Sequence, residues 1–139
     1  MEFDASEDEG AGRGKRAAPS RRVRVLIIDD DPQVLRSLQR ALAEHDVTTA
    51  DGGRAALAHL EKDARFDAIL CDLLMHGMTG MELHAELGRR WPGLADRIVF
   101  MTGGAFTEAA QEFLARVPNT CIQKPFDLRA LRAAIVGMR

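Results

Sequence analysis

Polar side chains suited to phosphate chemistry stand where four short apolar runs of the chain end. They are Asp29, Asp30 and Asp31 after residues 25–28, Asp72 after residues 68–71, Thr102 after residues 98–101, and Lys124 with Pro125 after residues 121–123. In a parallel sheet, ligands bind at the edge formed by the carboxyl ends of the strands, so these groups are expected to meet. Carboxylates, a hydroxyl and an ammonium can together bind a divalent cation and accept a phosphoryl group.

The acidic residues are expected to form a metal site. Asp29, Asp30 and Asp72 would repel one another at close range, and at least one of their pKa values would rise. A hard cation such as Mg²⁺ relieves this repulsion, because it takes carboxylate oxygens and keeps waters for substrate oxygens. Capping of a helix that starts at Pro32 is the other interpretation of the acidic run. We favour capping for Asp31, which precedes Pro32, and metal ligation for Asp29 and Asp30.

Asp72 is the candidate phosphoryl acceptor, because it ends its apolar run alone and a loop over residues 73–80 follows it. Aspartyl phosphates are a known covalent form. Thr102 can donate its hydroxyl to a phosphoryl oxygen, and Gly103 can offer its N–H without steric obstruction. Lys124 is a flexible charge, expected to pair with Asp72 at rest and with the phosphoryl group afterwards.

Apolar runs of strand length alternate with segments of helical period along most of the chain. Strands are expected over residues 23–28, 47–50, 66–71, 97–101 and 120–123, and helices over residues 32–44, 53–61, 80–91, 106–117 and 127–138. The last helix is expected to bury Leu128, Leu131 and Ile135. This alternation predicts an α/β fold, a doubly wound sheet of five parallel strands covered on both faces.

Composition limits the function classes. A length of 139 residues predicts one domain, and a formal net charge of -2 argues against general nucleic-acid binding. No apolar stretch is long enough to span a membrane, and the polar start lacks a signal-peptide core. Cys71 and Cys121 are isolated in apolar runs, which favours buried thiols and a cytoplasmic location. Residues 1–21 are charged and nearly free of large apolar side chains, so we expect a disordered tail or linker before a folded domain over residues 22–139.

The histidines show no pattern of a site. His45, His59, His76 and His84 are scattered, and none has ligand spacing with a second histidine or a cysteine. Each is expected at the surface or in a loop.

The ordered motifs resemble the receiver domain of two-component response regulators. They are residues 25–32 (VLIIDDDP), Asp72 with residues 77–80 (GMTG), residues 101–104 (MTGG) and residues 124–126 (KPF). The resemblance covers about residues 22–138, and residues 101–131 look especially like receivers at the C-terminal end of hybrid sensor kinases. It implies a flavodoxin-like (βα)5 sheet with strand order 2-1-3-4-5.

The resemblance also implies roles for single residues. Asp72 would accept a phosphoryl group from the phosphohistidine of a sensor histidine kinase. Asp30 would bind Mg²⁺ directly and Asp29 largely through water, with the carbonyl of Leu74 completing a site in which Mn²⁺ is the alternative ion. Thr102 would be the switch hydroxyl.

Further implications concern the products of the reaction and its partners. Lys124 would pair with the phosphate, and the chain would be no enzyme beyond catalysing its own phosphorylation and dephosphorylation. The signal would leave through the face of residues 106–138, to an effector or to a histidine phosphotransfer protein, without nucleic-acid contact or membrane insertion.

Some positions depart from the family pattern. His76 replaces the usual proline, and Thr79 replaces the usual acid or asparagine. Cys121 stands where many receivers carry a Tyr or Phe that moves with the threonine, so the aromatic part of that coupled switch is missing here. Leu74 and Gly104 occupy positions that tune access of the attacking water, and neither offers an acid or amide. We therefore expect slow self-dephosphorylation.

Two other functions fit part of the pattern. A haloacid-dehalogenase-type phosphohydrolase would use Asp29 as its nucleophile, but Gln33 replaces the expected Thr or Val, no acidic pair follows Lys124, and the chain is short. A pseudo-receiver, a binding module that keeps the fold without the chemistry, would not need every acidic, hydroxyl and ammonium position filled.

Overall fold

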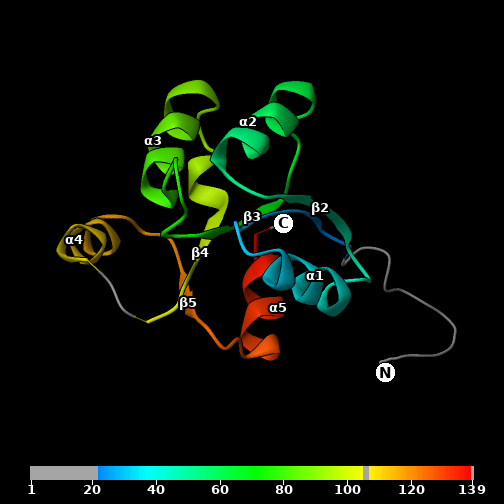
Figure 1. Cartoon of the computed structure of the whole chain (residues 1–139). Coiled ribbons are helices and arrows are strands. Elements are labelled where there is room, and N and C mark those ends of the chain that lie inside the picture. Colours follow the sequence, from blue (N-terminus) through cyan, green and yellow to red (C-terminus); the bar gives the residue numbers. More distant parts are fainter. Residues whose placement is uncertain (1–21, 105–106, 139) are drawn as a thin grey trace, which may run out of the picture.

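One parallel sheet forms the centre of the protein (Figure 1). The structure, a computed structural model, describes residues 22–104 and 107–138, so the expected tail over residues 1–21 lies outside the described residues. The strands are β1 (Arg24–Ile28), β2 (Asp46–Ala50), β3 (Ala68–Asp72), β4 (Ile98–Thr102) and β5 (Cys121–Gln123). They are all parallel and lie in the order β2-β1-β3-β4-β5, which confirms the expected sheet.

Helices cover both faces of the sheet, as a parallel sheet requires. They are α1 (Pro32–Ala41), α2 (Gly53–Lys62), α3 (Gly80–Arg90), α4 (Glu108–Arg116) and α5 (Leu128–Val136), with a 3₁₀ turn, η2 (Ala95–Arg97), before β4. Helices α1 and α5 lie together on one face, and α2 and α3 lie on the other, with α4 beside β5 (Figure 1).

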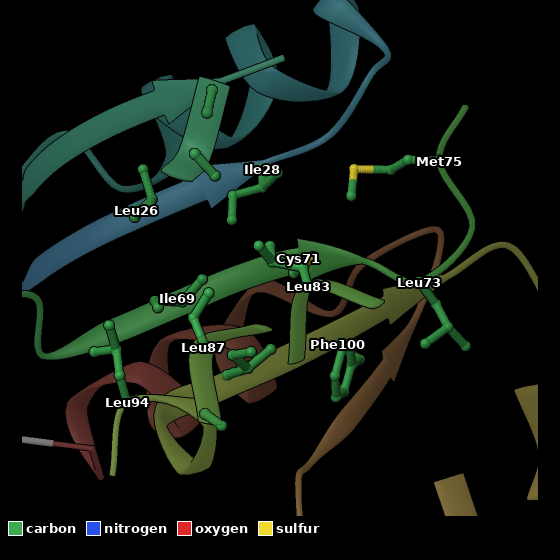
Figure 2. Packing of buried hydrophobic residues seen from close by; sticks show 14 of the residues in the cluster. Leu26, Ile28, Ile69, Cys71, Leu73, Met75, Leu83, Leu87, Leu94 and Phe100 are labelled. Carbon is green, nitrogen blue, oxygen red and sulfur yellow. The ribbon is translucent and has the colours of Figure 1, made fainter. Parts of the chain in front are cut away.

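Two apolar cores result, because successive side chains of a strand point to opposite faces. Leu26 and Ile28 of β1 pack with Phe100 of β4 and with residues of α2, α3 and α4 (Figure 2). Val25 and Ile27 pack on the other face with residues of α1 and α5. The central strands carry no polar alternation because both of their faces are buried.

Local sequence explains where the helices begin. Asp31, Thr79, Thr107 and Asp127 are N-caps whose side chains accept hydrogen bonds from backbone N–H groups of the first turn. Such caps satisfy donors that have no partner inside the helix. The predicted capping role of Asp31 is thus confirmed, with its carboxylate 2.9 Å from the N–H of Gln33.

One expectation about burial is wrong, and one helix is shorter than predicted. Helix α1 ends at Ala41, three residues before the predicted end, and the turn after it buries His45. The ring Nδ1 of His45 accepts a hydrogen bond of 3.0 Å from the N–H of Val23, so this histidine lies in the loop between α1 and β2, one of its two expected settings, and is buried there. Leu128, the first residue of α5, was expected in the core but is 41% exposed, whereas Leu131 and Ile135 are buried.

Candidate functional site

The predicted site residues meet at one edge of the sheet. Asp29 follows β1, Asp72 and Thr102 are the last residues of β3 and β4, and Lys124 follows β5. Strand pairing fixes this arrangement, because Asp72 lies opposite Met101 and Thr102 lies opposite Gln123. The N–H of Lys124 also donates a 2.7 Å hydrogen bond to the carbonyl of Thr102.

Three carboxylates form a compact acidic cluster. Asp29, Asp30 and Asp72 each offer an oxygen, and these oxygens lie within 4.8 Å of one another. Asp29 is fully buried, Asp72 is nearly so, and Asp30 is partly exposed. The Lys124 ammonium lies 2.9 Å from Asp29 Oδ2 and 3.4 Å from Asp72 Oδ1. It thus pairs more closely with Asp29 than with Asp72, the partner expected from the sequence.

The surroundings of Asp72 disfavour the ionised form of its carboxylate. Burial raises the pKa of Asp72 to about 6, the charge of Asp29 adds to the increase, and Lys124 opposes it. Burial lowers the pKa of the Lys124 ammonium, but the hydrogen bond and charge of Asp29, together with Asp72, outweigh this and hold it above its ordinary value. The sequence predicted that at least one pKa in the acidic cluster would rise. In the structure, the pKa of Asp72, the candidate phosphoryl acceptor, is raised.

The donor set fits a hard divalent cation. Closely placed carboxylate oxygens are the ligands that Mg²⁺ takes, and the Lys124 ammonium contacts two of the three acidic side chains, Asp29 and Asp72. A bound cation would offset the charge of Asp29, which adds to the raised pKa of Asp72.

Asp30 is in contact with His76, for which the sequence predicted only a surface or loop position. Its Oδ2 accepts a hydrogen bond of 2.9 Å from the His76 N–H, and the His76 ring Nδ1 lies 2.8 Å from the same oxygen. The hydrogen bond from the His76 backbone lowers the pKa of Asp30, and partial burial opposes this. The sequence did carry a signal for this contact, namely the replacement of the proline usual in the family by His76. Proline has no N–H to donate, whereas His76 has one.

The loop after Asp72 brings the backbone of Gly80 close to the backbone of Asp72 and Leu73. A Cβ atom at Gly80 would lie 2.7 Å from the Asp72 carbonyl oxygen, so only glycine fits there without a shift of the backbone. Thr79 and Glu82 form a reciprocal capping box that starts α3 at this point. Leu74 is 40% exposed. Thr79 therefore serves as a helix cap where the family usually has an acid or asparagine.

Thr102 is buried, and the structure gives its hydroxyl a local partner. Its Oγ1 accepts a 3.3 Å hydrogen bond from the N–H of Gly104, while the expected donor Gly103 is exposed. Gly104 has a φ of 103°, a conformation that glycine adopts readily. Both cysteines are free; Cys71 is buried and Cys121 half-buried.

An aromatic cluster links α3, β4 and α4. The rings of His84 and Phe113 meet edge to face at 5.2 Å, and Phe113 meets Phe100 in the same way at 5.3 Å. Burial lowers the pKa of His84, against the opposing effect of the Asn119 side chain. His84 lies on α3 and is half-buried, so it is only partly at the surface, where it was expected.

The family is shown by comparison with known proteins. Residues 25–136 match the family model of the response regulator receiver domain, and the chain belongs to this family. Members of it are generally signalling modules of two-component systems that bind Mg²⁺ at an acidic pocket and interact with histidine kinases.

Among curated relatives, the transcriptional regulatory protein TcrA of Mycobacterium tuberculosis is 30% identical over 91% of this chain and 49% of its own length. The regulatory protein AtoC of Escherichia coli is 35% identical over 81% of this chain and 24% of its own length. The chain thus spans half or less of the length of these relatives. The likeness to hybrid kinases in particular stays a prediction.

Solved structures agree with the fold. The chemotaxis protein CheY4 of Vibrio cholerae is 30% identical, with a TM-score of 0.70 over 85% of this chain and 99% of that one. A CheY-like receiver domain protein of Methanospirillum hungatei is 28% identical, with a TM-score of 0.71 over 82% of this chain and 90% of that one. Within residues 22–104 and 107–138, none of the helices has the length and apolar character needed to cross a membrane.

Proposed function

We propose that this receiver domain accepts a phosphoryl group on Asp72 from the phosphohistidine of a sensor histidine kinase, in a Mg²⁺-dependent reaction. One observation carries the proposal. The Asp72 carboxylate lies at the end of β3, within 4.8 Å of oxygens of two further aspartates and 3.4 Å from the Lys124 ammonium. A nucleophile, metal ligands and a cation for the phosphoryl group are thus side by side.

The protein contributes little covalent chemistry to the transfer. A carboxylate oxygen of Asp72 forms a bond to phosphorus as the phosphorus–nitrogen bond of the phosphohistidine breaks, and the donor imidazole leaves with the electron pair of that bond. Mg²⁺ held by Asp29, Asp30, Asp72 and the Leu74 carbonyl would supply neutralisation of charge on the phosphoryl oxygens.

After transfer, three further groups would bind the phosphoryl oxygens. The Lys124 ammonium is already 3.4 Å from Asp72, and it would pair with the added negative charge. The buried Thr102 hydroxyl would exchange its contact with the Gly104 N–H for a phosphoryl oxygen, and Gly103 would offer its exposed N–H.

The proposed output surface consists of α4, β5 and α5, within residues 106–138. Thr102 and β5 are adjacent in the sheet, so movement of the Thr102 side chain would reach this face directly. A histidine phosphotransfer protein or an effector would bind there. The free thiols of Cys71 and Cys121 support a cytoplasmic location for the domain.

Intact mass measurement tests the proposal. The protein is incubated with acetyl phosphate and Mg²⁺, alongside the variants Asp72→Asn and Asp29→Asn. We expect one added phosphoryl group in the wild type and none in Asp72→Asn. Peptide mapping that placed the phosphoryl group on Asp29 would instead indicate a haloacid-dehalogenase-type enzyme, which the family match does not favour. A wild type that gained no mass and bound no beryllium trifluoride would be a pseudo-receiver.

A further inference from the structure

We propose that a hydrogen bond from the ring Nε2–H of His84 to the side-chain oxygen of Asn119 forms when Asp72 is phosphorylated. His84 is then a positioning residue for the phosphorylated arrangement of α4. The inference rests on the proposed function, because phosphorylation supplies the movement that brings the two groups together. It deepens that function by naming the residues that carry the movement in a chain with Cys121 in place of the usual aromatic.

Two buried side-chain polar atoms have no hydrogen-bond partner within residues 22–104 and 107–138. They are Nε2 of His84 and Oδ1 of Asn119. Buried polar atoms are nearly always paired, so each exception calls for a physical explanation. An imidazole Nε2 can carry a proton, and an amide oxygen accepts one, so these two atoms are a matching donor and acceptor.

Phe100 of β4 connects the two residues. The centroid of its ring lies 6.0 Å from that of the His84 ring. Its N–H donates a 2.9 Å hydrogen bond to the carbonyl of Thr120, the residue that follows Asn119. Burial lowers the pKa of His84 and the Asn119 side chain opposes this, as expected of two side chains within reach of each other. A small displacement is therefore enough to join them.

The Asn119 side chain is fixed in its orientation. Its Nδ2 donates a 2.9 Å hydrogen bond to the Ala95 carbonyl and a 2.8 Å hydrogen bond to the Ile98 carbonyl. These bonds use both N–H groups of the amide, so Oδ1 cannot turn away without breaking them. The displacement that closes the new bond must therefore come from His84 and the residues packed on it.

Helix α4 is the element that can displace His84. Phe113 of α4 meets the His84 ring edge to face at 5.2 Å, and α4 begins at Glu108, shortly after Thr102. In the proposed function the Thr102 hydroxyl turns toward the phosphoryl group, which would carry the following segment and α4 with it. A hydrogen bond that forms only after this shift stabilises the phosphorylated state over the resting one.

Two substitutions of His84 separate its hydrogen bond from its packing. His84→Leu removes the ring N–H and leaves an apolar side chain to contact Phe113. His84→Gln returns a side-chain N–H that can reach the Asn119 oxygen. His59→Leu is the matched control, because His59 is also half-buried but lies on α2.

Calorimetric titration with beryllium trifluoride in Mg²⁺ measures the affinity for a phosphoryl mimic. We expect His84→Leu to weaken binding by about fivefold, the effect of one net hydrogen bond, and His84→Gln to restore most of it. The urea midpoint of metal-free His84→Leu should equal or exceed that of the wild type, because a buried atom without a partner is removed. His59→Leu should match the wild type in affinity.

Nuclear magnetic resonance of protein with ¹⁵N-labelled histidine observes the bond itself. A ring N–H signal of His84, protected from exchange with water, should appear when beryllium trifluoride and Mg²⁺ are added. It should be absent from the metal-free protein and from His84→Leu in both states.

Other results would overturn the inference. A protected His84 ring N–H in the metal-free protein would mean that the bond is already closed at rest. Equal affinities of the wild type and His84→Leu, or a loss of affinity matched by a loss of stability, would mean that His84 only fills space. In each case phosphorylation of Asp72 would still stand. A wild type that bound no beryllium trifluoride and gained no phosphoryl group would remove the proposed function and this inference together.

Discussion

The Lys124 ammonium lies 2.9 Å from Asp29 Oδ2, closer than the 3.4 Å that separates it from Asp72 Oδ1. Asp29 is fully buried, so loss of Lys124 would leave its carboxylate without a cationic partner in the metal-free protein. Any ion that binds Asp29 must therefore compete with Lys124. This competition links the stability of the metal-free protein to its affinity for a divalent cation.

Lys124→Met should destabilise the metal-free protein and strengthen Mg²⁺ binding. Loss of the ammonium leaves buried carboxylates without a cation, which we expect to lower the free energy of unfolding by about 1–3 kcal/mol. Added Mg²⁺ should recover more stability in the variant than in the wild type, as measured by urea unfolding with and without the ion. Lys62→Met, on the exposed end of α2, should change neither quantity. Equal recovery in both proteins would contradict the competition.

Asp72→Asn should stabilise the metal-free protein at neutral and higher pH. Burial and the charge of Asp29 raise the pKa of Asp72 to about 6, above the value of 3.8 for an unperturbed aspartate. The native state therefore binds this proton more tightly than the unfolded state, and wild-type stability falls as the pH rises from 3.8 to about 6.

The size and pH profile of this effect can be measured. At about pH 8 the variant should be more stable than the wild type by about 1–3 kcal/mol, and the advantage should disappear below about pH 4. Urea unfolding with a chelator at several pH values measures the difference. Asp51→Asn, an exposed change before α2, is the control. A variant less stable than the wild type at high pH would disprove the expected cost of ionising Asp72.

His45→Asn should flatten the loss of stability in mild acid. Burial lowers the pKa of His45 below its ordinary 6.5, so the unfolded chain takes up the proton first. Wild-type stability should therefore fall as the pH drops below 6.5 and level off below the folded-state pKa. The Asn side-chain oxygen can replace Nδ1 as acceptor for the Val23 N–H. Thermal unfolding between about pH 5 and 8 checks this, and an unchanged slope in the variant would refute it.

Gly80→Ala should weaken both the fold and the site. The added Cβ would meet the Asp72 carbonyl oxygen at 2.7 Å, and we expect a loss of about 1–3 kcal/mol of stability with weaker beryllium trifluoride binding. Gly88→Ala in the same helix meets only Ala95 Cβ, at 3.9 Å, and should stabilise by about 0.5–1 kcal/mol. Equal effects of the two substitutions would show that close backbone approach is not the cause.

Leu74→Asn should speed loss of the phosphoryl group from Asp72. Leu74 is exposed near the acceptor and offers no group that can orient an attacking water. The phosphorylated wild type should therefore decay slowly after the donor is removed, and the amide should shorten its half-life. Leu128→Asn changes a leucine of similar exposure on α5 and is the control. A wild-type half-life of seconds would be incompatible with this role of Leu74.

The sequence predicted the meeting of Asp72 and Thr102 because their positions follow from strand ends. Apolar runs mark the strands, and parallel pairing brings the carboxyl ends to one edge. The partners of individual side chains were not predictable in this way. The contact of Lys124 with Asp29 spans 95 residues, and that of His76 with Asp30 spans 46. Both depend on the path of a loop, which hydrophobic periodicity does not describe.

The burial of His45 was likewise not predictable from hydrophobic periodicity. His45 follows the end of α1, and its ring is buried because the chain turns there against the start of β1. Helical periodicity continued through residue 44 in the sequence, whereas the helix ends at Ala41. Turn geometry, rather than side-chain pattern, decides such positions.

The three consecutive aspartates after β1 have three different partners. Asp29 contacts Lys124, Asp30 contacts His76, and Asp31 caps α1 at the Gln33 N–H. Replacing one aspartate would remove one of these contacts. Inserting or deleting a residue within the run would shift each carboxylate into its neighbour's place and disturb all three contacts, even with the same charge present. The spacing of this segment should therefore tolerate less variation than its individual residues.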